Sequence, residues 1–439
     1  MLFIKRTSVK AILAGLTALL FCASCQGGES SEGKASEQTN KTLSLSVESV
    51  SYTACQSTFD EYQKRYPEVV MNVDVIDSSS FQNFRSKLNS QLMAGEGPDL
   101  IFIGFNYFND VDKLMKAGVF APLDPFLEAD EDFNRTDYVE PVLDAGVFDG
   151  TQYIMPLGYQ YRLAVTTQQM IDETGFDTAA SSAGYFGFVE QMDKLYENYP
   201  DRYVIANAGS LANFPNVMGV ELFDYKNGKV LMDTPEMKQA CEYYQKLYAQ
   251  DNDNSRLYGS DFPFVASELH EKKSMLYFAL DIGSVFELAN EIGLCGDTPV
   301  MLPYPEVDGD VGSVCQFAMA IRANSQNQQN AYNMIDLFLE EDSQLSVSGG
   351  DLPVRKSALH QVVQMEYQRK NLAEDSAVTE EFANQYEQLA SSVKSCHFTN
   401  HLVVSDFVGK KMKPYFLGEK SYEECMKDFV DYAEIYLSE

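Results

Sequence analysis

The chain has 439 residues, of which 45% are hydrophobic and 12% aromatic, so it can bury more than one core and two domains are expected. Its formal net charge is −32, which disfavours nucleic acid as a partner because binding to that polyanion depends on Lys and Arg neutralising phosphates. A phosphorylated ligand is disfavoured more weakly for the same reason, a neutral ligand fits best, and a cationic ligand stays open.

Residues 1–24 have the pattern of a bacterial signal peptide. Three basic residues precede an apolar run over 11–22, which is too short to cross a bilayer as a helix because spanning takes roughly 20 residues. Small residues and then Cys25 follow, an order that resembles the lipobox of bacterial lipoproteins, although Cys22 stands where that motif usually has Leu. We expect cleavage before Cys25 and lipidation of its sulfur, with a plain secreted form as the alternative.

Residues 25–41 are predicted to be a flexible linker. After Cys25 the segment QGGESSEGKASEQTNK has no aliphatic residue larger than Ala, so it cannot bury a core. The leader carries three basic residues and no acid, so its removal changes the formal charge from −32 to −35. No later stretch approaches 18 uninterrupted apolar residues, so the only membrane contact that we expect is the lipid anchor.

Six cysteines follow the linker, an even number that permits disulfides in an exported protein. They are far apart in the sequence, form no CxxC pair, and belong to domains that are large enough to need no crosslinks. We expect mostly buried free thiols, with Cys295 and Cys315 as the pair to test first. The six are Cys55, Cys241, Cys295, Cys315, Cys396 and Cys425.

The folded part begins with a predicted strand, helix, strand unit. Apolar residues alternate with polar ones over 43–47 and again over 71–75, which predicts two strands. Between them, aromatic residues recur at helical spacing until Pro67 ends the helix. The pattern continues with a helix over 81–93, a strand over 100–103 and a helix from about 109 to 118.

Alternation of this kind implies a mainly parallel sheet that is covered by helices. Ligands of such sheets bind at the carboxyl ends of the strands, so the loops after the strands are the first candidates for a site. These loops are residues 48–53, 77–80 and 104–108.

Five landmarks follow one another in the sequence. They are AGEGPDLIFIGFNYFNDVDKLMKAGVFAPLDP at 94–125, DGTQYIMP at 149–156, a hydrophobic segment followed by DIGS at 274–284, AMAIRAN at 318–324 and GGDLPVRKS at 349–357. In this order and at this spacing they resemble the family 1 extracellular solute-binding proteins of ABC sugar importers, the group that includes maltose-binding protein. A predicted final helix over 422–439 also fits that family.

The resemblance implies an α/β, two-lobe periplasmic-binding-protein-like fold of type II. Each lobe would be a mainly parallel sheet flanked by helices, and three crossovers, near 156–160, 301–305 and 345–351, would join the lobes. The N-terminal lobe would comprise residues 42–157 and 303–346, and the C-terminal lobe residues 158–302 and 347–439.

The function implied by the resemblance is binding without catalysis. The chain would capture an extracellular carbohydrate by hinge closure and deliver it to the permease subunits of an ABC transporter, as a monomer anchored to the outer face of the cytoplasmic membrane. No cofactor, no metal and no catalytic residue is expected. Because the chain has no Trp, Tyr and Phe would have to stack on the sugar rings.

The resemblance also suggests ligand contacts in the first half of the chain, several of them with a structural alternative. Alignment on the PDL landmark brings Asn106 and Tyr107 to polar contact positions, and Phe105 beside them would stack on a ring or pack against a helix. Alignment with maltose-binding protein on Pro156 places Gln160 where that relative has a ligand-contacting carboxylate. The flanking residues Tyr159 and Tyr161 would face the cleft or the core. The loop after the first strand adds Ser51 and Tyr52 as candidates.

Later candidates come from two further segments. In the loop after the strand that ends at residue 280, Asp281 would accept hydroxyl hydrogen bonds or cap a helix, next to Ser284 and Phe286. At the third crossover, two glycines would let the backbone approach a ligand or would form a hinge turn. This segment supplies Gly349, Gly350 and Asp351.

Other readings compete with sugar binding. His397 and His401 beside Cys396 have metal-ligand spacing, but HFTNH lacks the glutamate of a zinc protease, so a surface or capping role is expected. The sequence has no GxSxG or GxxxxGK[ST] motif. A peptide, an amino acid or a polyamine is the alternative ligand, and a secreted glycoside hydrolase is the alternative from another class.

Overall fold

The structure is a computed structural model that describes the chain from residue 41 onward with gaps. The described residues are 41–77, 81–104, 111–199, 203–205, 223–235, 237–239, 241–242, 245, 274–286, 288, 297–304, 306, 309–346, 351–368, 379–398 and 407–438. The predicted signal peptide and all but the last residue of the predicted linker lie outside this part. None of the described helices is long and apolar enough to cross a membrane.

Fourteen strands are described. They are β1 Thr42–Glu48, β2 Val70–Ile76, β3 Leu100–Gly104, β4 Val147–Phe148, β5 Thr151–Gln152, β6 Ile154–Thr167, β7 Tyr203–Ile205, β8 Phe223–Asp224, β9 Lys229–Val230, β10 Ser274–Ile282, β11 Pro299–Pro303, β12 Gly312–Ile321, β13 Leu352–Pro353 and β14 Ser395–Phe398. β4 pairs only with β5 and β8 only with β9, and the other ten form one sheet.

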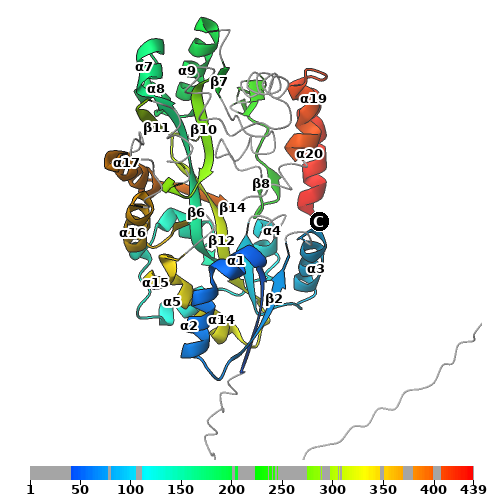
Figure 1. Ribbon diagram of the computed structural model, residues 1–439. Helices are drawn as coiled ribbons and strands as arrows, with labels where there is room; N and C mark the ends of the chain where they lie inside the picture. The colour runs from blue at the N-terminus through cyan, green and yellow to red at the C-terminus, as the bar shows by residue number, and fades with distance from the viewer. Residues whose placement is uncertain are drawn as a thin grey trace, which may run out of the picture. The chain divides into compact units, whose positions relative to one another are not determined.

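The helices lie around this sheet (Figure 1). They are α1 Ser49–Ala54, α2 Gln56–Arg65, α3 Phe81–Met93, α4 Val111–Lys116, α5 Asp124–Ala129, α6 Glu140–Asp144, α7 Gln168–Thr174, α8 Thr178–Ser181, α9 Tyr185–Asn198, α14 Gln328–Leu339, α15 Glu341–Gln344, α16 Lys356–Tyr367, α17 Glu380–Ser391, α19 Lys413–Phe416 and α20 Tyr422–Ser438. A 3-10 turn at Arg135–Asp137 and a π turn at Phe407–Met412 complete them.

The predicted strand, helix, strand unit is present. β1 and β2 pair in parallel, as do β1 and β3, and α2 buries Phe59 and Tyr62 on one face before it ends at Arg65. The predicted loop at 48–53 is wrong, because helix α1 starts directly after β1. Its residues include no Gly or Pro, and Tyr52 stacks on Phe59 with 5.4 Å between the ring centroids, which holds α1 against α2.

Strand β6 is the central element of the sheet. Along the sheet the order is β2, β1, β3, β12, β6, β10 and β7, and β6 also pairs with the short strands β11 and β13. β11, which overlaps the second predicted crossover, pairs with residues 163–167 of β6, and β13, which follows the third, pairs with residues 158–159. The pairings of β6 are antiparallel, whereas the edge formed by β2, β1 and β3 is parallel.

Asp99 of the PDL landmark has a structural role. Its carboxylate accepts hydrogen bonds from the amide and hydroxyl of Ser44 in β1, at 2.9 and 2.6 Å, and from the hydroxyl of Ser325 at 2.6 Å. Burial of Asp99 raises its pKa, but the hydrogen bonds from Ser325, Ser44 and Asn327 outweigh burial and leave the pKa below its ordinary value. The residue therefore joins β1, the start of β3 and the turn after β12.

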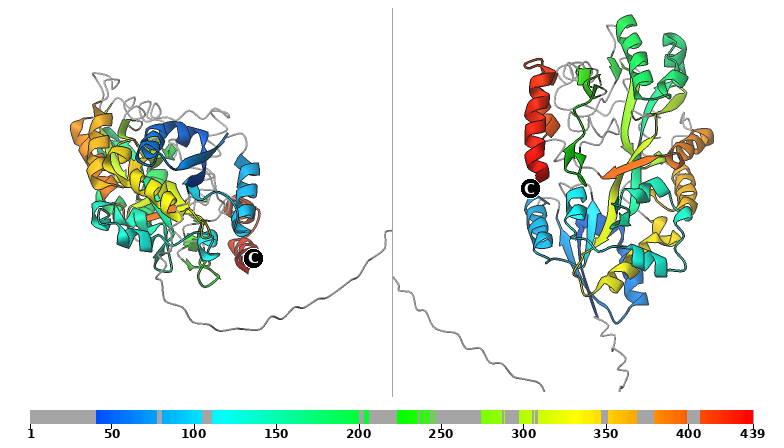
Figure 2. Two further views of the ribbon diagram at one scale, coloured as in Figure 1. Left: turned by 90° about the horizontal axis from the view of Figure 1, so that it is seen from below. Right: turned by 180° about the vertical axis from the view of Figure 1, so that it is seen from behind.

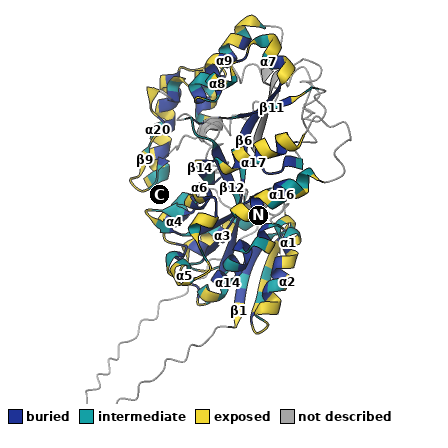
Figure 3. Cartoon of the chain, turned by 90° about the vertical axis from the view of Figure 1, so that its left-hand side faces the viewer, coloured by how far each residue is buried: buried dark blue, intermediate teal, exposed yellow. Residues whose placement is uncertain are grey.

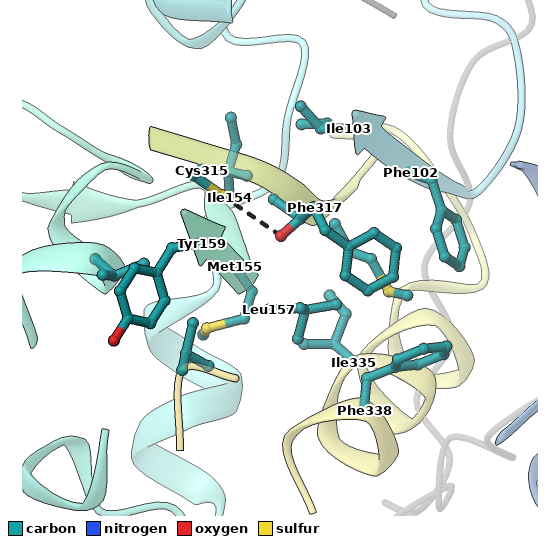
Figure 4. Close-up of a cluster of buried hydrophobic side chains, with 14 of the residues drawn as sticks. Phe102, Ile103, Ile154, Met155, Leu157, Tyr159, Cys315, Phe317, Ile335 and Phe338 are labelled. Carbon is teal, nitrogen blue, oxygen red and sulfur yellow. Dashed lines mark hydrogen bonds between the residues drawn. The ribbon is translucent and has the colours of Figure 1, made fainter. Parts of the chain in front are cut away.

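Buried apolar side chains form two clusters. The first cluster includes side chains from β1, β3, most of β6, β12, α4 and α14, and Figure 4 shows part of it around Phe102, Leu157 and Phe317. The second cluster includes side chains from α9, α19 and α20. Figure 3 shows that the strands are mostly buried and that exposed residues lie mainly on the helices. Two cores are what the length of the chain predicts.

The cysteine prediction is confirmed for the described residues. Cys55, Cys241, Cys315, Cys396 and Cys425 are buried free thiols. Burial raises the pKa of the Cys55 thiol and of the Cys396 thiol to about 12, so neither is a reactive thiolate at neutral pH. Cys295, the other member of the pair chosen for testing, lies outside the described residues.

Candidate ligand-binding site

Two glutamines interrupt the burial of the two longest strands. Gln160 is the one residue of β6 that is not fully buried, and Gln316 is the one residue of β12 with that property. Nε2 of Gln316 donates a hydrogen bond to Oε1 of Gln160 at 2.9 Å. A polar, partly exposed pair in the middle of an otherwise apolar sheet is the type of position that binds ligands rather than fills a core.

A β-bulge directs Gln316 toward Gln160. Cys315 pairs with Tyr159 and Phe317 with Gly158, so Gln316 is an extra residue of β12 that has no opposite number on β6. Bulges turn side chains away from the regular alternation and are frequent beside binding sites. The hydrogen bond between the amides shows that the extra residue lies on the same face as Gln160.

Two further polar residues share this face. Arg162 is two residues after Gln160 on β6 and is 3% exposed. His397 of β14 pairs with Val314, and Val314 in turn pairs with Gln160, so all three side chains lie on one face. We call Gln160, Arg162, Gln316 and His397 the polar face.

The imidazole of His397 is neutral at physiological pH. Burial and, to a lesser extent, the positive charge of Arg162 together lower its pKa to about 4. A neutral imidazole offers one N–H donor and one acceptor, and the two amides add donors and acceptors beside it. The predicted surface or capping role of His397 is wrong, because the residue is partly buried within a strand.

Tyr159 and Tyr161 point to the opposite face of β6 and are fully buried. The hydroxyl of Tyr159 donates to the carbonyl oxygen of Ala390 at 2.9 Å, and that of Tyr161 donates to the carbonyl oxygen of Tyr386 at 3.1 Å. Both acceptors belong to α17, so these tyrosines join the sheet to a helix. Of the two environments expected for them, the structure places both in the core.

The loop after β10 is held by a residue of α16. Glu366 accepts a hydrogen bond from the hydroxyl of Ser284 at 2.9 Å and a longer one from the amide of Phe286 at 3.5 Å. Ser284 is 4% exposed, whereas Phe286 is partly exposed. Strand β10 extends to Ile282, so Asp281 belongs to the strand and not to the loop in which it was expected, and its side chain is not among those described.

The remaining predicted contacts lie elsewhere in the chain. Ser51 and Tyr52 are partly buried in α1, where the carbonyl of Ser51 accepts the amide of Cys55 at 2.9 Å. Asp351 precedes β13, which lies beside the start of the polar face on β6. The other candidates fall outside the described residues: Cys25, Phe105, Asn106, Tyr107, Gly349 and Gly350.

Sequence reasoning did not place Gln316, His397 or Glu366 in this region, and it singled out only His397, for its metal-ligand spacing. The position of Gln316 on this face depends on a bulge in β12, and that of His397 depends on the pairing of β14 with β12. Glu366 is one of many acidic residues on helices, and only its contact with Ser284 separates it from them.

A separate groove lies beside α20. Its volume is about 530 Å³, and it lies between α20 and residues 233–238. None of the predicted contacts lines it. Within the part of the chain that the structure describes, no three His, Cys, Asp or Glu side chains are placed to hold a metal ion.

Comparison with known proteins assigns the family. The model of the bacterial extracellular solute-binding proteins matches residues 57–373, which is more than half of the chain. The chain belongs to this family. Solute binding is thus its role, and an extracellular location, at the cell surface or in the periplasm, follows from membership.

Individual relatives are distant. An uncharacterized ABC transporter extracellular-binding protein of Pyrococcus horikoshii is 20% identical over 268 residues, which are 56% of this chain and 58% of that protein, so the match spans less than two thirds of the relative. The structure of the sugar-binding protein MalE of Xanthomonas citri aligns with 90% of this chain and 97% of its own, at 17% identity and a TM-score of 0.64.

A third comparison gives the same fold. The cyclic alpha-maltosyl-1,6-maltose binding protein of Arthrobacter globiformis aligns over 90% of this chain and 98% of its own, at 15% identity and a TM-score of 0.60. The predicted two-lobe α/β fold of periplasmic binding proteins is confirmed by these neighbours, and the resemblance to extracellular solute-binding proteins is confirmed by the family model.

Proposed function

We propose that the chain is a substrate-binding lipoprotein that captures an extracellular carbohydrate, of oligosaccharide size, by hinge closure and delivers it to an ABC transporter permease. The ligand would bind at the polar face. Lobe boundaries at 42–157 with 303–346 and at 158–302 with 347–439, lipidation at Cys25 and a monomeric state belong to the same proposal. The protein would carry out no catalysis.

The observation that carries the proposal is the hydrogen-bonded pair of Gln160 and Gln316. Sugar hydroxyls both donate and accept, and a carboxamide also does both, so paired amides suit a neutral polyhydroxylated ligand. The neutral imidazole of His397 adds one donor and one acceptor on the same face. Charge supports the same choice, because a strongly acidic surface does not repel a neutral sugar.

Two similar proteins named above support the ligand class. One is described as a sugar-binding protein and another as binding a cyclic maltosyl-maltose. These descriptions belong to proteins of 15–17% identity, so they favour carbohydrate as a class and select no particular sugar.

A thermal-shift screen tests the proposal directly. The purified protein is heated with a panel of mono- and oligosaccharides, and with peptides, amino acids and polyamines as the competing class. A sugar that binds the folded state should stabilise it by about 2.7 kcal/mol at a hundredfold excess over the dissociation constant. Stabilisation by polyamines alone, with an affinity that falls steeply as salt rises, would contradict the carbohydrate assignment.

A further inference from the structure

A lysine on α4 contacts the end of the last helix, 323 residues later in the chain. Nζ of Lys113 donates a hydrogen bond to the carbonyl oxygen of Tyr436 at 2.7 Å and lies 4.1 Å from the centre of the Tyr436 ring. Val111, Leu114 and Met115 of α4 belong to the first cluster, whereas Tyr436 packs against the second cluster. The contact therefore joins the two cores directly.

A second polar contact joins the same pair of cores. Lys226, in the turn between β8 and β9, forms an ion pair with Asp149, in the turn between β4 and β5. Phe148 packs against the first cluster, and Tyr225 packs against the second. Asp149 has a φ of 51°, a left-handed backbone conformation that is typical of a tight hairpin turn such as the one between β4 and β5.

The two contacts belong to one surface. α4 packs against β4, and α20 packs against β9, so the four elements are neighbours in pairs. The ring of Phe223 in β8 lies 5.7 Å from that of Tyr436 and 6.3 Å from that of Phe429, which fixes the hairpin of Lys226 to α20. We call Lys113, Asp149, Lys226 and Tyr436 the clasp.

The clasp lies on the side of the sheet that carries the polar face. In Figures 1 and 2 α16 and α17 lie on one side of β6 and β12, and α20 lies on the other side with its C-terminal end next to α4. Tyr159 and Tyr161 reach α17, so Gln160 points away from that helix, toward the side of α20. The polar face and the clasp are therefore on the same side of the sheet.

We infer that the clasp stabilises the closed arrangement of the two lobes and that Lys113 and Asp149 set the affinity for ligand without touching it. The inference rests on the proposed function in that it assumes closure over the polar face. Closure is favoured only by contacts that the open arrangement lacks, and we take the contacts of the clasp, which join residues 42–157 to residues 158–302 and 347–439, to be of this kind. Apparent affinity follows the closed fraction, because the dissociation constant equals the intrinsic constant divided by that fraction.

The two contacts differ in strength. The ammonium of Lys113 meets the negative end of α20 and an aromatic face, and both interactions favour a cation. Asp149 and Lys226 are each more than half exposed, at 57% and 58%, so water weakens their ion pair. Lys113 is therefore the principal member of the clasp.

The first experiment measures closure without any ligand. Spin labels on the full chain at Ser57→Cys in α2 and Glu197→Cys in α9 report the distance between elements of the two clusters, and both positions are exposed. Lys113→Met should shift the distance distribution to longer values, and Asp149→Asn should do so to a smaller extent. Lys116→Met removes the same charge from the exposed side of α4 and should leave the distribution unchanged.

The second experiment measures dissociation of a sugar found in the thermal-shift screen. Lys113→Met should speed dissociation about tenfold and Asp149→Asn about twofold, whereas Lys116→Met should leave it unchanged. Urea unfolding of each variant checks that the fold is retained, and Asp149→Asn, on an exposed turn, serves if Lys113→Met fails to fold.

An unchanged distance distribution in both clasp variants would overturn the inference, even if the sugar binds well. Longer distances in a protein that binds no sugar would support the clasp and count against the proposed function. The two claims can therefore fail separately.

Discussion

Tyr159 and Gln160 are neighbours on β6, yet their surroundings are opposite. Tyr159 is fully buried against α17 and donates to a backbone carbonyl, whereas Gln160 is partly exposed and bonds to another side-chain amide. Strand geometry causes the difference, because successive side chains point to opposite faces. One strand can thus hold a core on one face and offer a ligand site on the other.

The largest expected effect is on the buried face. Tyr161→Ala removes a fully buried ring that packs 5.2 Å from that of Tyr386, and we expect a loss of about 3–5 kcal/mol in the free energy of unfolding. Urea denaturation measures this loss. Tyr161→Phe is the control, since it keeps the ring, and a loss below about 1 kcal/mol for the alanine variant would contradict the core assignment.

The next effect is on binding and not on stability. Gln160→Ala breaks the amide pair and should weaken the affinity for a bound sugar by about 2 kcal/mol, with a change in unfolding free energy below about 1 kcal/mol. Titration calorimetry and urea denaturation measure the two quantities. If the variant unfolded much more easily and bound the sugar as before, the polar face would be a structural feature only.

Tyr159→Phe should lower stability and leave the affinity for sugar unchanged, the reverse of Gln160→Ala. It removes the hydrogen bond to Ala390 and should cost about 1 kcal/mol of stability, while the affinity for sugar stays unchanged. The same two measurements apply. A weaker affinity at unchanged stability would show that Tyr159 reaches the ligand.

The last prediction is a pH dependence of stability from His397. Its pKa is about 4 in the folded protein, below the ordinary value of about 6.5, so the unfolded chain binds a proton first as the pH falls. The folded state should lose stability between about pH 6.5 and pH 4, and part of this loss should disappear in His397→Gln. Urea midpoints at pH 7, 6, 5 and 4 compare the two proteins, and identical curves would contradict the shifted pKa.

Much of the fold could be predicted because local patterns determine it. Alternation over 43–47 and 71–75 predicted β1 and β2, and the apolar run at 100–103 predicted β3. The final helix was also predicted and ends at Ser438. The PDL landmark reflects the fold rather than ligand contact, since its Asp99 joins β1 to the turn after β12.

The candidate site was harder to predict, because its members come from strands that are far apart in the sequence. Gln160 was predicted as a ligand contact together with Tyr159 and Tyr161. The alternation of side chains along a strand already implies that these tyrosines lie on the opposite face from Gln160. Gln316 requires a bulge and His397 requires the pairing of β14 with β12, and neither can be read from local sequence. The tyrosines were placed in the core by their contacts with α17, which follows them by more than 200 residues.

A crystal structure of the protein with a sugar from the screen tests the central claim most directly. The account predicts sugar hydroxyls within hydrogen-bond distance, about 2.7–3.2 Å, of the side-chain amides of Gln160 and Gln316. A sugar bound in the groove beside α20, or anywhere out of hydrogen-bond reach of both glutamines, would contradict it.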